Sequence, residues 1–113
     1  MVPPVNLERE VFLTSHLGYT TSKFGVGMMM KGLGCEFRGE CAFNSLWPRT
    51  AIDTNAVRNV TNTKGISQLL RTADVMGAAA RKIFKSDFNK YTAKAFVDDE
   101  VLIGSGDETM SSL

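Results

Sequence analysis

A helical periodicity dominates the first third of the chain. From about Leu17 to Phe37, large side chains recur at three- and four-residue steps, and at about 100° per residue they fall within an arc of about 80°. The residues of this stripe are Tyr19, Lys23, Val26, Met30, Leu33 and Phe37. The pattern predicts one long helix that buries the stripe in the core.

The same helix contains five glycines, at positions 18, 25, 27, 32 and 34. Each glycine in a helix interior costs roughly 0.5–1 kcal/mol relative to alanine. A compensating interaction is therefore needed, and the usual one is the close approach of another backbone. We expect a neighbouring segment to pack directly against this helix.

Two later stretches have the character of strands. The run Cys41–Trp47 shows little alternation and ends at Pro48, which is typical of a strand covered on both faces. Ala93–Val97 is a second candidate, stopped by Asp98 and Asp99. A helix followed at once by an apolar strand favours an α/β fold with a parallel sheet.

Two further helices are predicted between these strands. Ala51–Val57 forms a short one, and a longer one runs from Thr72, as its N-cap, to Phe84 or Lys85, with Asp74 in the first turn. The apolar face of the longer helix consists of Val75, Met76, Ala79, Ala80, Ile83 and Phe84. Residues 5–14 are predicted as a loop with apolar anchors at Val11, Phe12 and Leu13. The polar stretch 59–65 is predicted as a second loop, and 104–113 as a flexible tail.

Composition limits the kinds of function. The chain has 113 residues, 43% hydrophobic and 22% charged, which suits a globular chain of at most one domain. Its net charge is +1 without a basic run, so we expect small-molecule or protein partners and no nucleic acid. No stretch approaches the roughly 20 apolar residues of a transmembrane segment.

Cysteine usage and the C-terminus bear on location. Cys35 and Cys41 have no histidine or further cysteine at ligand spacing, so we interpret them as reduced thiols of an intracellular protein and expect no metal site. The C-terminal Ser111-Ser112-Leu113 is similar to the peroxisomal targeting signal Ser-Lys-Leu but lacks its basic residue. A peroxisomal or mitochondrial location therefore stays open beside a cytoplasmic one.

The residues that most clearly suggest catalytic chemistry are Tyr19 and Lys23, one helical turn apart in Tyr19-Thr-Thr-Ser-Lys23. A tyrosine has an ordinary pKa of about 10, and a nearby ammonium group favours the phenolate and lowers that pKa. The alternative is an ordinary exposed pair on a helix, because this spacing is common. Their place on the predicted buried stripe favours the chemical interpretation.

A second segment lies in register with this pair. Tyr19-Thr-Thr-Ser-Lys23-Phe-Gly is followed, 25 residues after the tyrosine, by Asn44-Ser-Leu-Trp-Pro48-Arg-Thr-Ala-Ile-Asp-Thr54. In order and spacing the two segments resemble the active-site helix, sixth strand and following loop of the short-chain dehydrogenase/reductases. The resemblance implies an α/β fold in which residues 1–103 form the C-terminal portion of a doubly wound, Rossmann-like parallel sheet, with the first βαβ half missing.

The resemblance also implies roles for individual residues. Tyr19 would be the general acid/base, and Lys23 would bind the nicotinamide ribose of NAD or NADP and lower the Tyr19 pKa. The residues lining the nicotinamide side would be Pro48, Thr50, Ile52 and Thr54, with Thr54 as the carboxamide partner. The substrate would be a small carbonyl compound or secondary alcohol.

The match departs from the family in two places, and alternatives stay open for the loop. Arg49 stands where the family commonly has glycine, and Thr54 comes one residue later than in the common pattern. Pro48 could simply terminate a strand, and the threonines at positions 50 and 54 could cap helices.

Other parts of a complete dehydrogenase are absent from the sequence. The family's catalytic serine has no counterpart, since no serine occurs between Met1 and Thr14 and Val2 or Pro3 stands in its place. Gly25-Val-Gly27 lies inside the predicted helix and lacks the next glycine, so it does not form a pyrophosphate-binding loop. NAD and NADP cannot be distinguished from these residues.

Two functions are consistent with these observations. The chain is a fragment or truncated form of an NAD(P)-dependent oxidoreductase, or it is an inactive truncated paralogue that binds a complete dehydrogenase subunit through its glycine-rich helix. In both cases apolar surface and open strand edges would be left uncovered, so we expect a homo- or hetero-oligomer.

Overall fold

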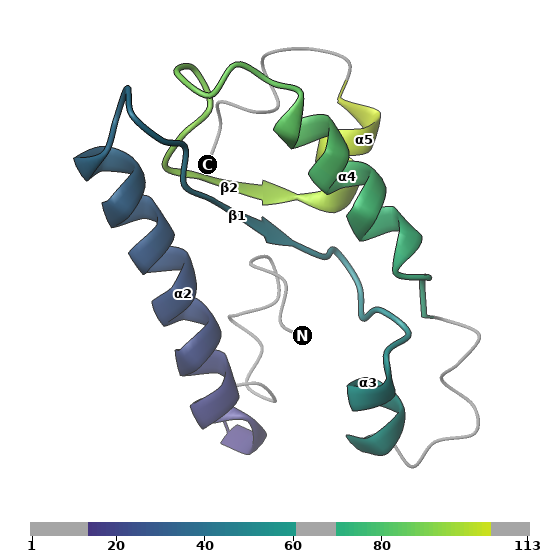
Figure 1. The fold of residues 1–113 in the computed structure, drawn as a ribbon. Coiled ribbons are helices and arrows are strands. Elements are labelled where there is room, and N and C mark those ends of the chain that lie inside the picture. Colours follow the sequence, from purple (N-terminus) through teal and green to yellow (C-terminus); the bar gives the residue numbers. More distant parts are fainter. Residues whose placement is uncertain (1–13, 61–69, 105–113) are drawn as a thin grey trace.

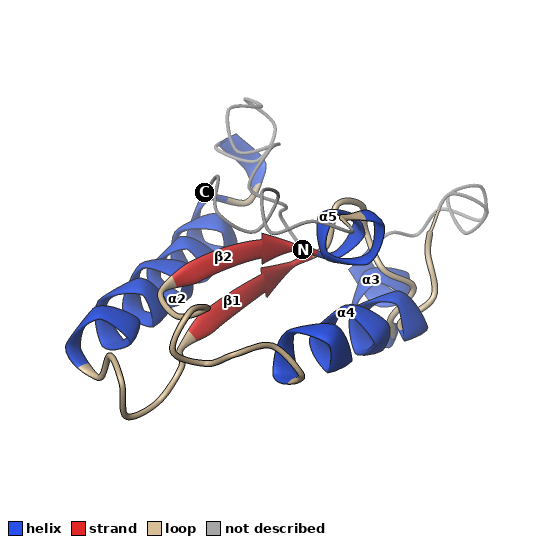
Figure 2. Cartoon of the chain, turned by 90° about the horizontal axis from the view of Figure 1, so that it is seen from above, coloured by secondary structure: helices blue, strands red, loops and turns tan. Residues whose placement is uncertain are grey.

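The computed structural model describes residues 14–60 and 70–104. Its helices and strands are α2 (Leu17–Glu36), β1 (Asn44–Trp47), α3 (Asn55–Val60), α4 (Asp74–Phe84), β2 (Lys94–Val97) and α5 (Asp98–Ile103). Helix α2 lies on one face of the two strands, and α4 and α5 lie on the other (Figures 1 and 2). The predicted α/β fold with a parallel sheet is confirmed.

The two strands pair in parallel, with Leu46 opposite Phe96 and Trp47 opposite Val97. Because successive side chains point to opposite faces of a strand, these two pairs serve different layers. Leu46 and Phe96 pack with Ala79 of α4, whereas Trp47 lies against Gly27 of α2. The chain between the strands passes through α4, as a parallel crossover requires.

Both strands are shorter than predicted. The strand expected over 41–47 begins at Asn44, because the turn after α2 continues further: the carbonyl of Phe37 accepts hydrogen bonds from the amides of Glu40 (3.0 Å) and Cys41 (3.1 Å). The strand expected from Ala93 begins at Lys94, since Ala93 has a φ of 59°, outside the extended region. Local turns therefore set both strand starts.

The helix predicted over Leu17–Phe37 is confirmed, but the predicted buried stripe is wrong. Tyr19 is 40% exposed, Val26 47% and Phe37 37%, Lys23 is also exposed, and Met30 and Leu33 are half-buried. The buried residues of α2 are Thr20 and Gly34. With Gly27 they form a face about 80° around the helix from the stripe.

Two glycines explain this rotation of α2. A Cβ on Gly34 would lie 2.5 Å from the Ala93 amide nitrogen, and one on Gly27 would lie 3.1 Å from Cζ2 of Trp47. Close approach of another backbone is therefore confirmed at Gly34, whereas Gly27 meets a side chain. The glycines at 18, 25 and 32 have no described atom within 4 Å of such a Cβ.

Helix α4 follows its predicted apolar pattern with one exception. Ala79 is fully buried and forms a cluster with Phe96 and Val101, while Val75, Met76, Ala80 and Ile83 are half-buried. Phe84 is 86% exposed because α4 ends there. The predicted N-cap is also wrong: Ala73 precedes the helix, without a side-chain capping bond, although Asp74 does lie in the first turn.

The two short helices differ from prediction. The helix expected over Ala51–Val57 starts only at Asn55, because Ile52 instead forms a parallel bridge with Arg71. Helix α5 was not predicted; it begins at Asp98, where β2 ends. The loops predicted over 5–14 and 59–65 and the tail 104–113 fall largely outside the described residues.

Candidate functional site

The Tyr19–Lys23 pair and the Pro48–Thr54 loop lie at the same edge of the sheet. Helix α2 runs antiparallel to β1, since Gly34 touches Ala93 just before β2 and Gly27 touches Trp47 at the end of β1. Tyr19 lies eight residues before Gly27, about 12 Å further along the helix axis. The first turns of α2 therefore extend past the carboxyl ends of the strands (Figure 1), the edge where open α/β sheets bind ligands.

Lys23 lies over the ring of Tyr19, with its Nζ 5.6 Å from the ring centroid. This is cation–π distance. Partial burial raises the pKa of the Tyr19 phenol above its ordinary value of 10.0, the opposite of the lowering expected from the sequence. Ser22 does not extend the pair, because its hydroxyl donates to the Tyr19 carbonyl at 2.7 Å.

The loop residues predicted to face a nicotinamide have different environments. Pro48 is buried directly after β1, Ile52 is 1% exposed, and Thr50 is exposed. Thr54 accepts a hydrogen bond from the Val57 amide at 3.4 Å, so the helix-capping alternative holds for Thr54. It does not hold for Thr50, whose hydroxyl oxygen accepts a bond from Nε of Arg71 at 2.7 Å.

A hydroxyl has one donor and two acceptor positions. Acceptance of one hydrogen bond therefore leaves the protons of the Thr50 and Thr54 hydroxyls for a ligand oxygen. Lys23 is exposed and supplies ammonium donors at the same edge. These donors suit the hydroxyl and amide oxygens of a nicotinamide nucleoside, whereas the buried Ile52 side chain contributes to the loop interior.

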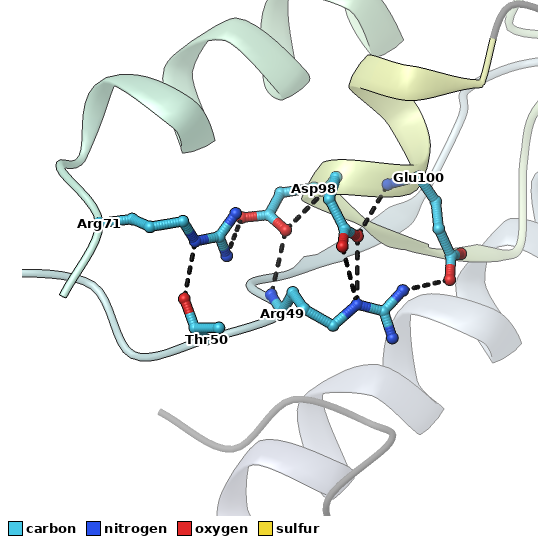
Figure 3. Close-up of polar contacts among 6 residues, drawn as sticks. Arg49, Thr50, Arg71, Asp98 and Glu100 are labelled. Carbon is cyan, nitrogen blue, oxygen red and sulfur yellow. Dashed lines mark hydrogen bonds and ion pairs between the residues drawn. The ribbon is translucent and has the colours of Figure 1, made fainter. Parts of the chain in front are cut away.

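Arg49, where the sequence departs from the dehydrogenase pattern, ties the loop to α5 (Figure 3). Its Nε donates to both carboxylate oxygens of Asp99, at 3.2 and 3.0 Å, and its Nη2 pairs with Glu100. The hydrogen bonds to Asp99 and Glu100 raise the pKa of Arg49. Burial alone would raise the pKa of Asp99, but the hydrogen bond and charge of Arg49 outweigh it and lower that pKa.

A second arginine, Arg71, also contacts the loop and the start of α5. Nη2 of Arg71 lies 2.8 Å from Oδ2 of Asp98, an ion pair outside the angular range of a hydrogen bond. Asp98 is fully buried, and its Oδ1 accepts the backbone amides of Arg49 (3.0 Å) and Asp99 (2.7 Å). Sequence reasoning missed these contacts, because Arg49 lies about 50 positions from Asp98 and Asp99, and Arg71 is also distant from Asp98 in the sequence. The acidic run indicated only the end of a strand.

No metal site is found in residues 14–60 and 70–104, which hold no group of three potential metal ligands among His, Cys, Asp and Glu. Cys35 and Cys41 are exposed free thiols. Within the same ranges, no helix has the length and apolar character needed to span a bilayer.

The fold of the described residues is similar to that of a dehydrogenase. The chain matches the crystal structure of a "putative dehydrogenase" from Xanthomonas campestris with a TM-score of 0.73 and 31% identity, over 94% of this chain and 38% of that one. No known protein-family profile matches the sequence.

The sequence relatives give a more particular match. The chain is homologous to hydroxysteroid dehydrogenase-like protein 2: it is 38% identical to the mouse protein over 104 residues and 37% identical to the human protein over 106. These alignments cover 92% and 94% of this chain but only 21% and 25% of the two relatives. The chain thus spans about a fifth to a quarter of their length.

Proposed function

We propose that residues 1–103 are the C-terminal half of a short-chain dehydrogenase/reductase domain, from an NAD(P)-dependent oxidoreductase acting on a carbonyl or secondary alcohol. One observation carries the proposal: α2 crosses β1 antiparallel, so that the Tyr19–Lys23 pair and the Pro48–Thr54 loop share the carboxyl edge of the parallel sheet. The similarity to hydroxysteroid dehydrogenase-like protein 2 supports it, because the relatives extend far beyond the matched part.

In this proposal Tyr19 moves the proton. Its phenol donates to the substrate oxygen during carbonyl reduction, and its phenolate accepts that proton during alcohol oxidation. A nicotinamide, when bound, would supply the hydride chemistry. Lys23 would hold the ribose hydroxyls and place its positive charge beside Tyr19. Pro48, Thr50 and Thr54 would form the wall on the nicotinamide side, and the buried Ile52 would support that wall from inside the loop.

The 113-residue chain alone is expected to be inactive. Partial burial raises the pKa of Tyr19, which disfavours the phenolate that alcohol oxidation needs as a base. The serine and the glycine-rich phosphate loop of the family are not in the sequence. Both would come from a longer form of the protein or from a partner chain.

Titration of NADH and NADPH, followed by nicotinamide fluorescence, tests the proposal. We expect no micromolar binding by the chain alone, and binding by a longer form that carries the upstream half. Tyr19→Phe together with Lys23→Ala should abolish that binding, whereas Tyr19→Phe alone should chiefly remove turnover. Tyr91→Phe, at the other tyrosine, is the matched control and should leave binding and turnover intact.

Two results would count against the proposal. Micromolar binding of NADH or NADPH by the isolated chain would show that the chain already contains a complete cofactor site. A longer form that binds nicotinamide equally well with and without Tyr19 and Lys23 would show that these residues do not form the cofactor site.

The second candidate is a non-catalytic partner of a complete dehydrogenase subunit. It is favoured by the apolar residues that α2 leaves exposed, among them Met28 at 76% and Met29 at 56%. In this case the chain should co-sediment with a complete subunit, and Tyr19→Phe should leave the activity of the complex unchanged.

A further inference from the structure

One residue, Arg71, contacts four consecutive residues of the loop that follows β1. Its Nε donates to the Thr50 hydroxyl, its amide donates to the Ala51 carbonyl at 3.4 Å, and its carbonyl accepts from the Asp53 amide at 2.9 Å. Ile52, between them, pairs with Arg71 in a parallel bridge. The course of the chain from Thr50 to Asp53 therefore depends on where Arg71 is held.

Arg71 is held by a buried carboxylate. Asp98 is fully buried at the first residue of α5, and its Oδ2 lies 2.8 Å from Nη2 of Arg71. A carboxylate removed from water is strongly destabilising unless it is paired, so the two groups constrain each other. The other oxygen of Asp98 accepts the Arg49 amide at 3.0 Å, which fixes the beginning of the same loop.

The hydrogen bond between Arg71 and Thr50 also determines where the Thr50 hydroxyl proton points. Because the Arg71 Nε–H is the donor, it occupies a lone pair of the Thr50 oxygen, and the hydroxyl proton must point elsewhere. Thr50 is exposed, so its proton is available to a ligand. The ligand group that fits is a hydrogen-bond acceptor, such as an amide carbonyl.

We propose that Asp98 and Arg71 are positioning residues: buried Asp98 fixes Arg71, which in turn holds the Thr50–Asp53 segment and orients the Thr50 hydroxyl as a donor toward a bound amide. The assignment of that amide to a nicotinamide rests on the proposed function. The positioning itself is a property of this chain and is measurable without cofactor. Arg49 adds a second attachment to α5 through Asp99 and Glu100 (Figure 3).

The test is NMR of the ¹⁵N-labelled chain, observing the Arg71 Nε–H and the exchange of the Asp53 amide. Thr50→Val should shift the Arg71 Nε–H signal and accelerate its exchange by about tenfold, and Thr50→Ser should restore both. Thr50 is exposed, so neither variant threatens folding. Asp98→Asn and Arg71→Lys should each accelerate exchange of the Asp53 amide by about tenfold, with α2 amides as the internal reference.

An Arg71 Nε–H signal that is identical in Thr50→Val and wild type would overturn the proposal. So would an unchanged Asp53 amide in Arg71→Lys. NADH titration of the same variants, in the longer form, separates this proposal from the proposed function. A loop that responds as expected in a protein that binds no nicotinamide supports the positioning and contradicts only the oxidoreductase assignment.

Discussion

At the scale of single residues, α2 packs against the segment just before β2 at a position that has no side chain. Gly34 lies against the backbone of Ala93, and its carbonyl accepts a hydrogen bond from the buried Thr92 hydroxyl at 3.3 Å. Thr92 also accepts the Phe43 amide, at 3.2 Å. At this contact there is therefore no space for a larger side chain on α2.

We predict that Gly34→Ala destabilises the chain. The added methyl would meet the Ala93 nitrogen at 2.5 Å, and backbone cannot move aside as a flexible side chain can. Overpacking of this kind costs about 1–3 kcal/mol, more than the helix gains from alanine. Urea unfolding at one protein concentration measures the difference.

Gly32→Ala is the matched control, two residues away in the same helix. No described atom lies within 4 Å of its new methyl, so it should stabilise the chain by about 0.5–1 kcal/mol. Equal effects of the two substitutions would show that Gly34 is not in close contact.

Tyr19 provides a second prediction at this scale. Its folded pKa lies above the ordinary 10.0, so its contribution to stability is present below about pH 10 and is lost as the pH rises through the folded pKa. Near-ultraviolet absorbance of phenolate, compared between wild type and Tyr19→Phe, measures this titration. Burial is the cause of the shift, so Lys23→Met should barely move it. A phenol that ionises below pH 10 in the isolated chain would contradict the expectation.

At the scale of elements, periodicity located α2 and β2 within one residue but chose the wrong face of α2. Hydrophobic spacing identifies the face with the largest side chains, whereas α2 packs through the face with small ones, at Gly27 against Trp47 and at Gly34 against Ala93. The five glycines did predict close packing. They could not indicate which of them would be used, because that depends on the position of Ala93, far along the chain.

The candidate site was predictable only where its residues are near neighbours in sequence. Tyr19 and Lys23 lie one turn apart on a helix, and the structure places them together. The polar network joins Arg49 and Arg71 to the start of α5, a helix that the sequence did not reveal. Contacts between residues far apart in the chain have no local pattern, and short helices bounded by loops have little periodicity.

The link between the loop and α5 should depend on pH. Arg49 lowers the pKa of Asp99 below its ordinary 3.8, so the stability gained from this pair is present above about pH 4 and is lost as the pH falls through the folded pKa. Asp99→Asn mimics the protonated form. Its deficit in urea stability relative to wild type should be largest near neutral pH and should vanish in acid. A deficit that does not change with pH would show that the ionised carboxylate is not what holds Arg49.

At the scale of the whole molecule, several large apolar side chains of the described residues are exposed. Val26, Met28, Met29 and Phe84 are all exposed, and β1 pairs with β2 on one edge only within the described sheet. A cavity of about 270 Å³ lies between β1 and α4, lined in part by Leu46, Ile83 and Phe88. It is on the opposite face from Tyr19 and so belongs to packing rather than to the site.

We therefore expect the purified chain to associate, with a sedimentation coefficient and an unfolding midpoint that both rise with concentration. Val26→Lys together with Met29→Lys should weaken association by about tenfold or more, because each buried aliphatic side chain contributes about 1.5–3 kcal/mol. Both residues face away from the sheet side of α2, so the helix itself should persist by circular dichroism. Thr21→Lys with Ser22→Lys adds the same charge to α2 without removing apolar surface, and should weaken association much less. A monomer with a sharp, concentration-independent unfolding transition would show that the exposed apolar face of α2 needs no partner. That result would contradict the expectation that the chain is part of a larger assembly.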